Sequence, residues 1–399
     1  MLSVSEASAQ IMARATFLGA ESVPLDETLA RVLAADVLAP RDLPPRDNSA
    51  MDGYAVLSAD LPGRLPIAAE VAAGAGALAP HRPGSATRIM TGAPLPPGAD
   101  TVVMRENVTV EGNDAVFSAA EKPGKNIRRA GEDIAEGALA IGRGTLIGAG
   151  EIGLLAALGH PRVMVGKRPR VSILSTGDEL IEVIENPPID RIINSNAHAL
   201  AAQVRLAGGI PVRCPIVGDD KLEVIDAIAN ALEDADILLT SGGVSVGDYD
   251  FVKEALAANG IEPDFWEVAV KPGKPLVFGQ AQNGALVFGL PGNPVSSMVT
   301  FELFVRPALL RVTGAKNTSR PRARVKIDRD LKKDATRTHF LRANLRAEGN
   351  VLHANLFSKQ GSGMLTSMSG ADALVIVPQE SLGARAGEEL EAIVLRPPQ

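Results

Sequence analysis

The chain has almost no cysteine. Its single cysteine, Cys214, excludes a disulfide framework and a cysteine-ligated metal cluster. Cys214 lies in the apolar run of residues 210–217, where a buried, inert thiol is expected rather than a nucleophile. The sequence also lacks the roughly 18 consecutive apolar residues of a membrane span. It begins without the basic start and apolar stretch of a signal peptide. We therefore expect a soluble, cytoplasmic protein with no membrane partner.

Basic charge and familiar catalytic signatures are missing as well. The net charge of −7 argues against a general nucleic-acid binder, because such proteins carry basic patches. The P-loop, HExxH and GxSxG motifs are absent, and no cysteine–histidine arrangement is suggested. The histidines are scattered and are expected to be structural or exposed; they are His81, His160, His198, His339 and His353. These absences favour a site that works without a covalent nucleophile.

The length of 399 residues is too great for one hydrophobic core and predicts several domains. A capping box at Ser3–Glu6 opens an amphipathic helix, and a second short helix is expected over residues 25–35. Residues 40–56 are rich in proline and aspartate, which predicts a loop without regular structure. Short β-rich runs follow, including a hairpin around Gly112. A helical pattern returns at residues 151–158, so the first domain is predicted to be discontinuous.

From residue 169 the pattern alternates between strands and helices, which is typical of a parallel α/β domain. Asn194 or Ser195 is expected to cap one helix, and Asn293-Pro294 to begin the last one. A linker at residues 314–323 leads to further strands, which predict a small β-barrel or sandwich. The predicted domains are a discontinuous helical domain of residues 1–44 and 140–168, an inserted β domain of residues 45–139, an α/β domain of residues 169–315 and a C-terminal β domain of residues 316–399.

Residues 235–250 hold the most informative pattern of the α/β domain. A short apolar run ends in Ser241-Gly242-Gly243, where paired glycines permit backbone angles that side chains forbid. A strand, a glycine turn and a helix start would present free backbone N–H groups to an anion. Asp250 follows the turn, and a carboxylate beside a phosphate makes sense if a divalent cation lies between them. An ordinary turn with surface acids is the alternative interpretation.

Other polar loops follow the strands of this domain. If the sheet is parallel, the loops share one edge, where ligands bind in α/β folds. The loops comprise residues 175–179, 218–220, 271–275 and 289–294. Acids and lysines would converge there, which favours a metal-assisted phosphate site with Mg²⁺. Helix capping by Asp219-Asp220, and prolines that merely stop and start elements, are the alternative explanations.

Eight motifs resemble, in the same order, those of the molybdopterin molybdenumtransferase (MoeA) family, which includes the gephyrin E domain. They extend from Asn48 to Ser367 and so span most of the chain. The motifs are NSAMDGYAV, IMTGAPLPPGAD, RRAGEDI, STGDEL, SGGVSVGDYDFV, KPGKP, GLPGNPVSS and SGMLTS. The resemblance implies a discontinuous helical domain, an inserted β domain, a MogA-like parallel α/β domain and a C-terminal β-barrel. The segmentation from periodicity agrees with that fold.

The resemblance also implies a function, the last step of molybdenum cofactor biosynthesis. Adenylylated molybdopterin and molybdate would be the substrates; the adenylate would be hydrolysed with Mg²⁺, AMP would leave, and molybdenum would enter the dithiolene. The family is homodimeric, with its site between the α/β domain of one chain and the β domain of the other. Further expected partners are the adenylyltransferase of the same pathway and the molybdoenzymes that accept the cofactor.

The resemblance divides the candidate site residues between two subunits. The partner's β domain would supply Asp52, Thr91 and Asp133. The candidate catalytic residues are Asp52, Asp133, Glu179 and Asp250, and the candidate metal ligands are Glu179, Asp219 and Asp250. The candidate substrate-binding residues are Thr91, Asp219, Ser241, Gly242, Gly243, Lys271, Lys274, Pro291, Pro294 and Ser367. No single acid is assigned as the general base, because the sequence gives no distances.

One position departs from the family pattern, since Glu267 stands where lysine is frequent. The change removes a positive charge beside the expected molybdate or phosphate contacts. Two other functions suit such a fold, a non-catalytic scaffold of the gephyrin type and a MogA-like adenylyltransferase. The acids that are present argue against the scaffold, and the flanking domains argue against the adenylyltransferase. No residue distinguishes molybdenum from tungsten.

Overall fold

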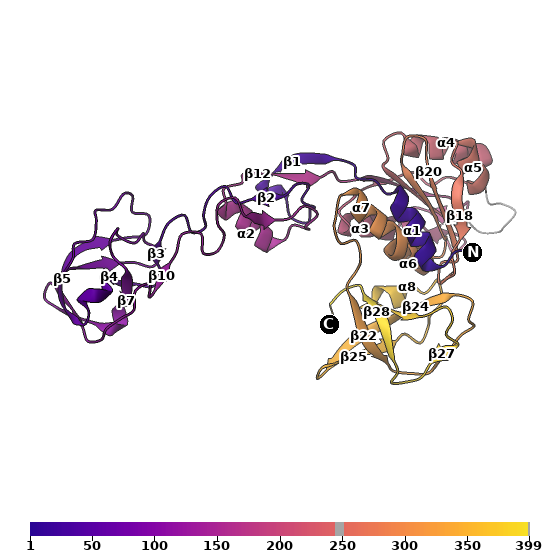
Figure 1. Ribbon diagram of the computed structural model, residues 1–399. Helices are drawn as coiled ribbons and strands as arrows, with labels where there is room; N and C mark the ends of the chain where they lie inside the picture. The colour runs from indigo at the N-terminus through magenta and orange to yellow at the C-terminus, as the bar shows by residue number, and fades with distance from the viewer. Residues whose placement is uncertain (244–250, 398–399) are drawn as a thin grey trace.

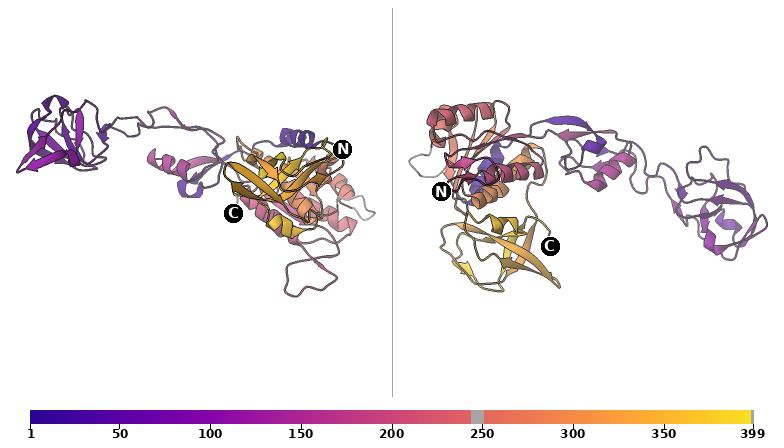
Figure 2. Two further views of the ribbon diagram at one scale, coloured as in Figure 1. Left: turned by 90° about the horizontal axis from the view of Figure 1, so that it is seen from below. Right: turned by 180° about the vertical axis from the view of Figure 1, so that it is seen from behind.

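The computed structural model describes residues 1–243 and 251–397 and shows an elongated chain (Figure 1). A β domain lies at one end, and an α/β domain and a β-barrel lie together at the other. A narrow segment of two-stranded ribbons joins the two ends, and Figure 2 shows the same separation from two further directions. The predicted fold class, a multidomain α/β plus β protein, is confirmed.

The joining segment is built from two stretches that are far apart in sequence. β1 (Ala20–Pro24) pairs antiparallel with β12 (Arg162–Gly166), and helix α2 (Ala149–Ala157) packs on this ribbon. β2 (Val37–Leu38) pairs in the same way with β11 (Leu139–Ile141). The joining segment is therefore discontinuous in sequence.

The predicted helix over residues 25–35 is wrong. Only a single 3₁₀ turn forms, η1 (Leu25–Glu27), and Ala30 then takes a φ of +60°. Leu33 instead forms a β-bridge with Val165. Pairing with a distant segment outweighs the weak helical pattern of this stretch.

Helix α1 (Val4–Arg14) begins at the predicted capping box, where the Ser3 side chain accepts from the amide of Glu6. Its buried residues Ala7 and Ile11 pack in the core of the α/β domain and not on α2. The first helix of the chain therefore belongs in space to the domain that holds the later strands.

The inserted β domain is a six-stranded sheet in the order β7-β4-β6-β5-β9-β8. Its strands are β4 (Gly53–Val56), β5 (Gly63–Val71), β6 (Ala86–Ile89), β7 (Thr101–Met104), β8 (Val108–Glu111) and β9 (Asp114–Phe117). β8 and β9 form the predicted hairpin. A short pair, β3 (Asn48–Ser49) with β10 (Ile127–Arg128), adjoins it.

Residues 40–56, predicted to lack regular structure, contain strand β4. This strand lies between β6 and β7, and all four of its residues are buried. Gly53 is required because an added Cβ would lie 2.0 Å from the carbonyl oxygen of Val103. Two neighbouring strands stabilise the extended form despite the proline- and aspartate-rich surroundings.

The α/β domain holds a six-stranded sheet in the order β16-β13-β17-β21-β20-β18. The strands are β13 (Arg170–Ser175), β16 (Ile210–Arg213), β17 (Ile237–Ser241), β18 (Pro263–Glu267), β20 (Pro275–Gln280) and β21 (Leu286–Leu290). β16, β13, β17 and β21 are parallel, whereas β20 is antiparallel to both of its neighbours.

Helices cover both faces of this sheet. They are α3 (Ser195–Leu206), α4 (Lys221–Leu232), α5 (Val252–Ala258), α6 (Pro294–Thr300) and α7 (Arg306–Val312), with the π-helical η4 (Phe301–Val305) between the last two. α1, α3, α6 and α7 pack on one face, and α4 and α5 pack on the other. Within the described ranges, no helix has the length and hydrophobicity needed to cross a membrane.

The C-terminal domain is a closed barrel, because β24 pairs with both β25 and β26. Its strands are β22 (Arg322–Ile327), β24 (Thr338–Glu348), β25 (Val351–Leu356), β26 (Ala373–Val377) and β28 (Glu389–Val394). Smaller elements of this domain are β23 (Leu331–Lys332), β27 (Gly383–Ala384) and α8 (Leu365–Ser369). In the α/β domain, the short strands β14 (Leu180–Ile181) and β15 (Ile192–Ile193) pair with each other. β19 (Val270–Lys271) joins β24 and so links the barrel to the α/β domain.

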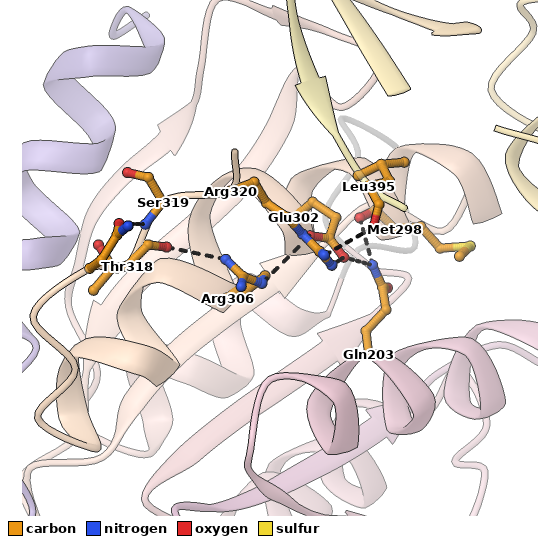
Figure 3. A network of polar contacts seen from close by, with 9 residues as sticks. Gln203, Met298, Glu302, Arg306, Thr318, Ser319, Arg320 and Leu395 are labelled. Atoms are coloured by element: carbon orange, nitrogen blue, oxygen red, sulfur yellow. Dashed lines mark hydrogen bonds and ion pairs between the residues drawn. The ribbon is translucent and has the colours of Figure 1, made fainter. Parts of the chain in front are cut away.

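A buried ion-pair network also joins these two domains (Figure 3). The Glu302 carboxylate accepts hydrogen bonds from Arg320 Nε at 2.9 Å and from Gln203 Nε2 at 3.0 Å. Arg320 Nη1 donates to the carbonyl of Leu395, just after β28, at 3.0 Å. Arg306 lies 4.0 Å from the same carboxylate. One carboxylate on η4 therefore connects α3, the interdomain linker and the last strand of the barrel.

Glu302→Gln is expected to lower the free energy of unfolding by about 3 kcal/mol, because the largely buried guanidinium groups lose their counter-charge. Denaturant unfolding followed through the fluorescence of Trp266, the only tryptophan of the chain, measures the change. Glu391→Gln is the matched control, since it breaks an exposed pair with Arg322 at 2.9 Å. That control should cost less than about 1 kcal/mol. Equal losses in the two variants would contradict the role given to Glu302.

Candidate functional site

A pocket of about 620 Å³ opens at the carboxyl edge of the parallel strands. Its walls come from the loops after β13, β16, β17 and β21 and from the first turn of α3. Seven of the sequence-predicted site residues line it: Glu179, Asp219, Ser241, Gly242, Gly243, Pro291 and Pro294. The parallel sheet thus brings together loops that are widely separated in sequence.

The glycine turn after β17 forms one wall of the pocket. Gly242 and Gly243 have φ values of +98° and +62°. A Cβ on Gly242 would lie 2.9 Å from the carbonyl oxygen of Thr176, and one on Gly243 would lie 2.4 Å from Val252 Cγ2. The Gly242 amide donates to the carbonyl of Leu290 at 3.3 Å. Both the backbone angles and the lack of space therefore require glycine at these positions.

Glu179 and Asp219 bring two exposed carboxylates to the pocket. The Asp219 amide donates to Asp178 Oδ1 at 3.0 Å, which ties together the loops after β13 and β16. The Glu179 carboxylate lies against Gly177, where an added Cβ would be 2.4 Å from Oε2. Neither pocket carboxylate forms an ion pair within the described part of the chain. Both side chains are exposed, and the Asp219 carboxylate accepts a hydrogen bond from the amide of Asp178 at 3.4 Å.

Asp220, and not Asp219, caps helix α4. Its Oδ1 accepts from the amides of Leu222 at 2.9 Å and Glu223 at 3.0 Å. The capping interpretation therefore applies to Asp220 alone and leaves Asp219 at the pocket. Pro294 has both of its predicted roles, because it begins α6 and also lines the pocket.

Asn196 is a pocket residue that the sequence pattern did not single out. Its Nδ2 donates to Ser241 Oγ at 2.9 Å and to the carbonyl of Gly292 at 2.8 Å. The Gly292 carbonyl can only accept, which fixes the orientation of the amide. Asn196 therefore cross-links the loops after β17 and β21. Its neighbour Asn194 has the predicted capping role and accepts from the amide of Ala197 at 3.1 Å.

Lys271, Lys274 and Ser367 lie outside the pocket lining. Lys271 is on β19, which pairs with the barrel strand β24. Lys274 Nζ forms an ion pair with Glu267 at 2.9 Å. Ser367 is only 2% exposed, and its hydroxyl accepts from Arg342 Nε at 3.1 Å. In this structure, Ser367 supports a loop of the barrel.

Asp52 and Thr91 adjoin strands β4 and β6 of the inserted β domain, which lies at the far end of the molecule from the α/β domain (Figure 1). Asp133 lies between β10 and β11, and its amide donates to the carbonyl of Leu43 at 3.0 Å. The hydroxyl and the amide of Thr91 both donate to Asp52 Oδ1, at 2.7 and 2.6 Å. These bonds, helped by the charges of Arg105 and Arg88, lower the pKa of Asp52 below its usual value. Asp133 is exposed. The pocket of one chain therefore does not contain these three residues.

Asp250, predicted as a catalytic residue and a metal ligand, falls in residues 244–250, outside the described residues. Where the structure does describe the chain, no group of three or more histidine, cysteine, aspartate or glutamate side chains is placed to hold a metal ion. Glu179 and Asp219 are the two carboxylates among the described residues that line the pocket. That pair fits Mg²⁺, which binds one or two carboxylates and completes its shell with substrate phosphate and water.

Three family descriptions match successive parts of the chain. The MoeA N-terminal region (domain I and II) matches residues 2–159, a probable molybdopterin binding domain matches residues 172–311, and the MoeA C-terminal region (domain IV) matches residues 324–395. A Haemophilus influenzae protein named molybdopterin molybdenumtransferase is 35% identical, over 97% of both chains. The chain belongs to the MoeA family.

Other similar proteins agree with this assignment. A Nostoc protein of the same name is 36% identical over 94% of this chain and 88% of its own. A Mycobacterium tuberculosis protein, molybdopterin molybdenumtransferase 2, is 37% identical over 93% of this chain and 94% of its own. The crystal structure of the MoeA protein from Pyrococcus horikoshii OT3 is 30% identical with a TM-score of 0.86, covering 99% of this chain and all of that one. The predictions of the MoeA fold and of an enzyme of the transferase class are confirmed.

Asp220→Ala is expected to lower the free energy of unfolding by about 1 kcal/mol, because it removes the N-cap of α4. Asp219→Ala, one residue earlier, should cost less than about 0.5 kcal/mol, as is usual for an exposed side chain. Denaturant unfolding of the two variants under identical conditions provides the comparison. A larger loss of unfolding free energy in Asp219→Ala than in Asp220→Ala would show that Asp219 has a structural role.

Proposed function

We propose that this MoeA family member inserts molybdenum into molybdopterin, using adenylylated molybdopterin and molybdate and releasing AMP. The observation that supports this most directly is the pocket, where a glycine turn and two exposed carboxylates meet at one sheet edge. A glycine turn lets phosphate oxygens approach the main chain closely, and carboxylates suit the Mg²⁺ that accompanies them. The names of the relatives point to the same chemistry.

Each group of residues has a distinct part in the proposed reaction. Hydrolysis adds water across the pyrophosphate link, so that AMP leaves and molybdopterin keeps its own phosphate. Glu179 and Asp219 would hold Mg²⁺, which supplies charge neutralisation at the phosphates. The Gly242 and Gly243 backbone would approach the anionic oxygens closely, because no side chain intervenes.

The proposed active enzyme is a homodimer, because one chain does not bring all of the predicted residues together. Asp52 directly precedes β4 of the inserted β domain, and Asp133 lies between β10 and β11, whereas Glu179 and Asp219 line the pocket of the α/β domain. A second copy would place its β domain over the pocket, where Asp52 and Asp133 help to position the metal oxo groups. The adenylyltransferase that makes the substrate and the molybdoenzymes that receive the product are the proposed protein partners.

Glu179→Ala is expected to lower the rate of AMP release by at least about tenfold, since it removes a proposed ligand of the metal. Incubation of the purified variant with adenylylated molybdopterin, molybdate and Mg²⁺, with AMP and loaded cofactor measured together, tests this. Glu262→Ala, an exposed glutamate outside the pocket lining, is the control and should retain the full rate. Wild-type AMP release without loaded cofactor would show a plain hydrolase and contradict the proposal.

Mixing Asp52→Ala with Glu179→Ala subunits tests the shared site separately. Each variant alone should be nearly inactive. Random re-pairing of equal amounts gives mixed dimers with one intact site each, so about a quarter of the wild-type activity should return. Denaturation and joint refolding, followed by the AMP assay, provide the measurement. No recovery, although mixed dimers are detected by mass spectrometry, would mean that both residues act within one chain or that no such site exists.

A further inference from the structure

The described lining of the pocket contains acidic side chains but no basic ones. Among the described residues that line it, two are carboxylates and none is lysine or arginine. An anionic ligand needs a cation nearby, because bare carboxylates repel it. Basic residues directly precede two pocket residues: Lys274 precedes Pro275, and Arg191, which donates to the carbonyl of Asp178, precedes Ile192. Of these two residues, Lys274 forms an ion pair with a carboxylate, Glu267.

The ion pair between Lys274 and Glu267 is built by the sheet. Glu267 ends β18 and lies opposite Pro275 at the start of β20, so Lys274, one residue before Pro275, lies near Glu267. The amide of Val268 donates to the carbonyl of Lys274 at 3.0 Å. This hydrogen bond brings together the two ends of the segment 268–274. Lys274 Nζ then lies 2.9 Å from Glu267 Oε1.

The loop that carries Lys274 is also held from its other side. Gly273 has a φ of +107°, and an added Cβ would lie 2.4 Å from Thr300 Cγ2 on α6. The amide of Ala269 donates to the carbonyl of Leu2 at 2.7 Å, which fixes the backbone after Glu267. The position of the pair is thus set by main-chain packing on both sides.

The pair is accessible to solvent, with side-chain exposures of 44% for Lys274 and 37% for Glu267. An exposed pair of this kind is weak and can exchange its carboxylate for another anion. An arriving oxyanion must therefore compete with Glu267 for the same ammonium group.

We propose that Glu267 is an affinity-determining residue, which weakens the binding of a tetrahedral oxyanion beside the pocket by occupying Lys274. The inference rests on the proposed function, in which molybdate and a nucleotide phosphate both reach this edge of the sheet. Both ligands share the chemistry that Lys274 recognises, a compact oxygen-bearing anion. Removal of the Glu267 charge then frees Lys274 without altering the backbone that places it.

Glu267→Gln is expected to bind the oxyanion about two- to fivefold more tightly than the unaltered protein, the range set by an exposed ion pair. Isothermal titration of the full chain with sodium molybdate alone, and with AMP alone, measures the two sources of oxyanion separately. The gain should shrink at high ionic strength, because salt screens exposed charges. If only the affinity for molybdate rises, Lys274 binds the metal oxyanion. If only the affinity for AMP rises, Lys274 binds the nucleotide phosphate.

Two further variants keep the test specific. Glu262→Gln removes the same charge from an exposed residue five positions earlier and should leave both affinities unchanged. Glu267→Gln combined with Lys274→Ala should lose the gain, because the freed ammonium is then absent. Unchanged affinity for both probes in Glu267→Gln, an equal gain in Glu262→Gln, or a gain that persists without Lys274 would each overturn the proposal. Failure of AMP release would count against the proposed function, whereas unchanged affinity in a protein that releases AMP would count against this inference alone.

Discussion

The site depends on the in-phase ends of three parallel strands. Ser175 on β13 lies opposite Ser241 on β17, which in turn lies opposite Leu290 on β21. Their loops therefore leave the sheet at one level, and their main chains approach so closely that Gly242 has no space for a side chain. A shift of one residue in this register would reverse the faces of the strand and separate the acids from the glycine turn.

The loop that carries Lys274, residues 271–275, reaches the same edge for a different reason. β20 is antiparallel to its neighbours, so its first residue, Pro275, enters the sheet where the parallel strands end. A loop that precedes one strand thus lies beside loops that follow the others. The acids and Lys274 belong to opposite strand directions, and the sheet brings both charges to one edge without placing lysine inside the pocket.

The elongated shape separates the predicted residues into two groups. The ribbons of β1 with β12 and β2 with β11 hold the β domain away from the α/β domain, whereas the Glu302 network and β19 hold the barrel against it (Figures 1 and 3). In the proposed mechanism this architecture makes association of two chains a condition of catalysis. The contact between the barrel and the α/β domain thus stabilises the part of the site that one chain provides. In the proposed dimer, the distant β domain contacts the pocket of the second chain.

The sequence by itself determined the elements whose signals are local. Helix α1 begins after Ser3 as its capping box predicts, and α6 begins after Asn293 as its cap and proline predict, because caps act over a few residues. The ordered motifs also identified the family. Only the tertiary structure decided which of Asp219 and Asp220 faces the pocket, that Asn196 cross-links two loops, and that residues 53–56 form a central strand. Those outcomes depend on partners distant in the chain, whose position no local pattern specifies.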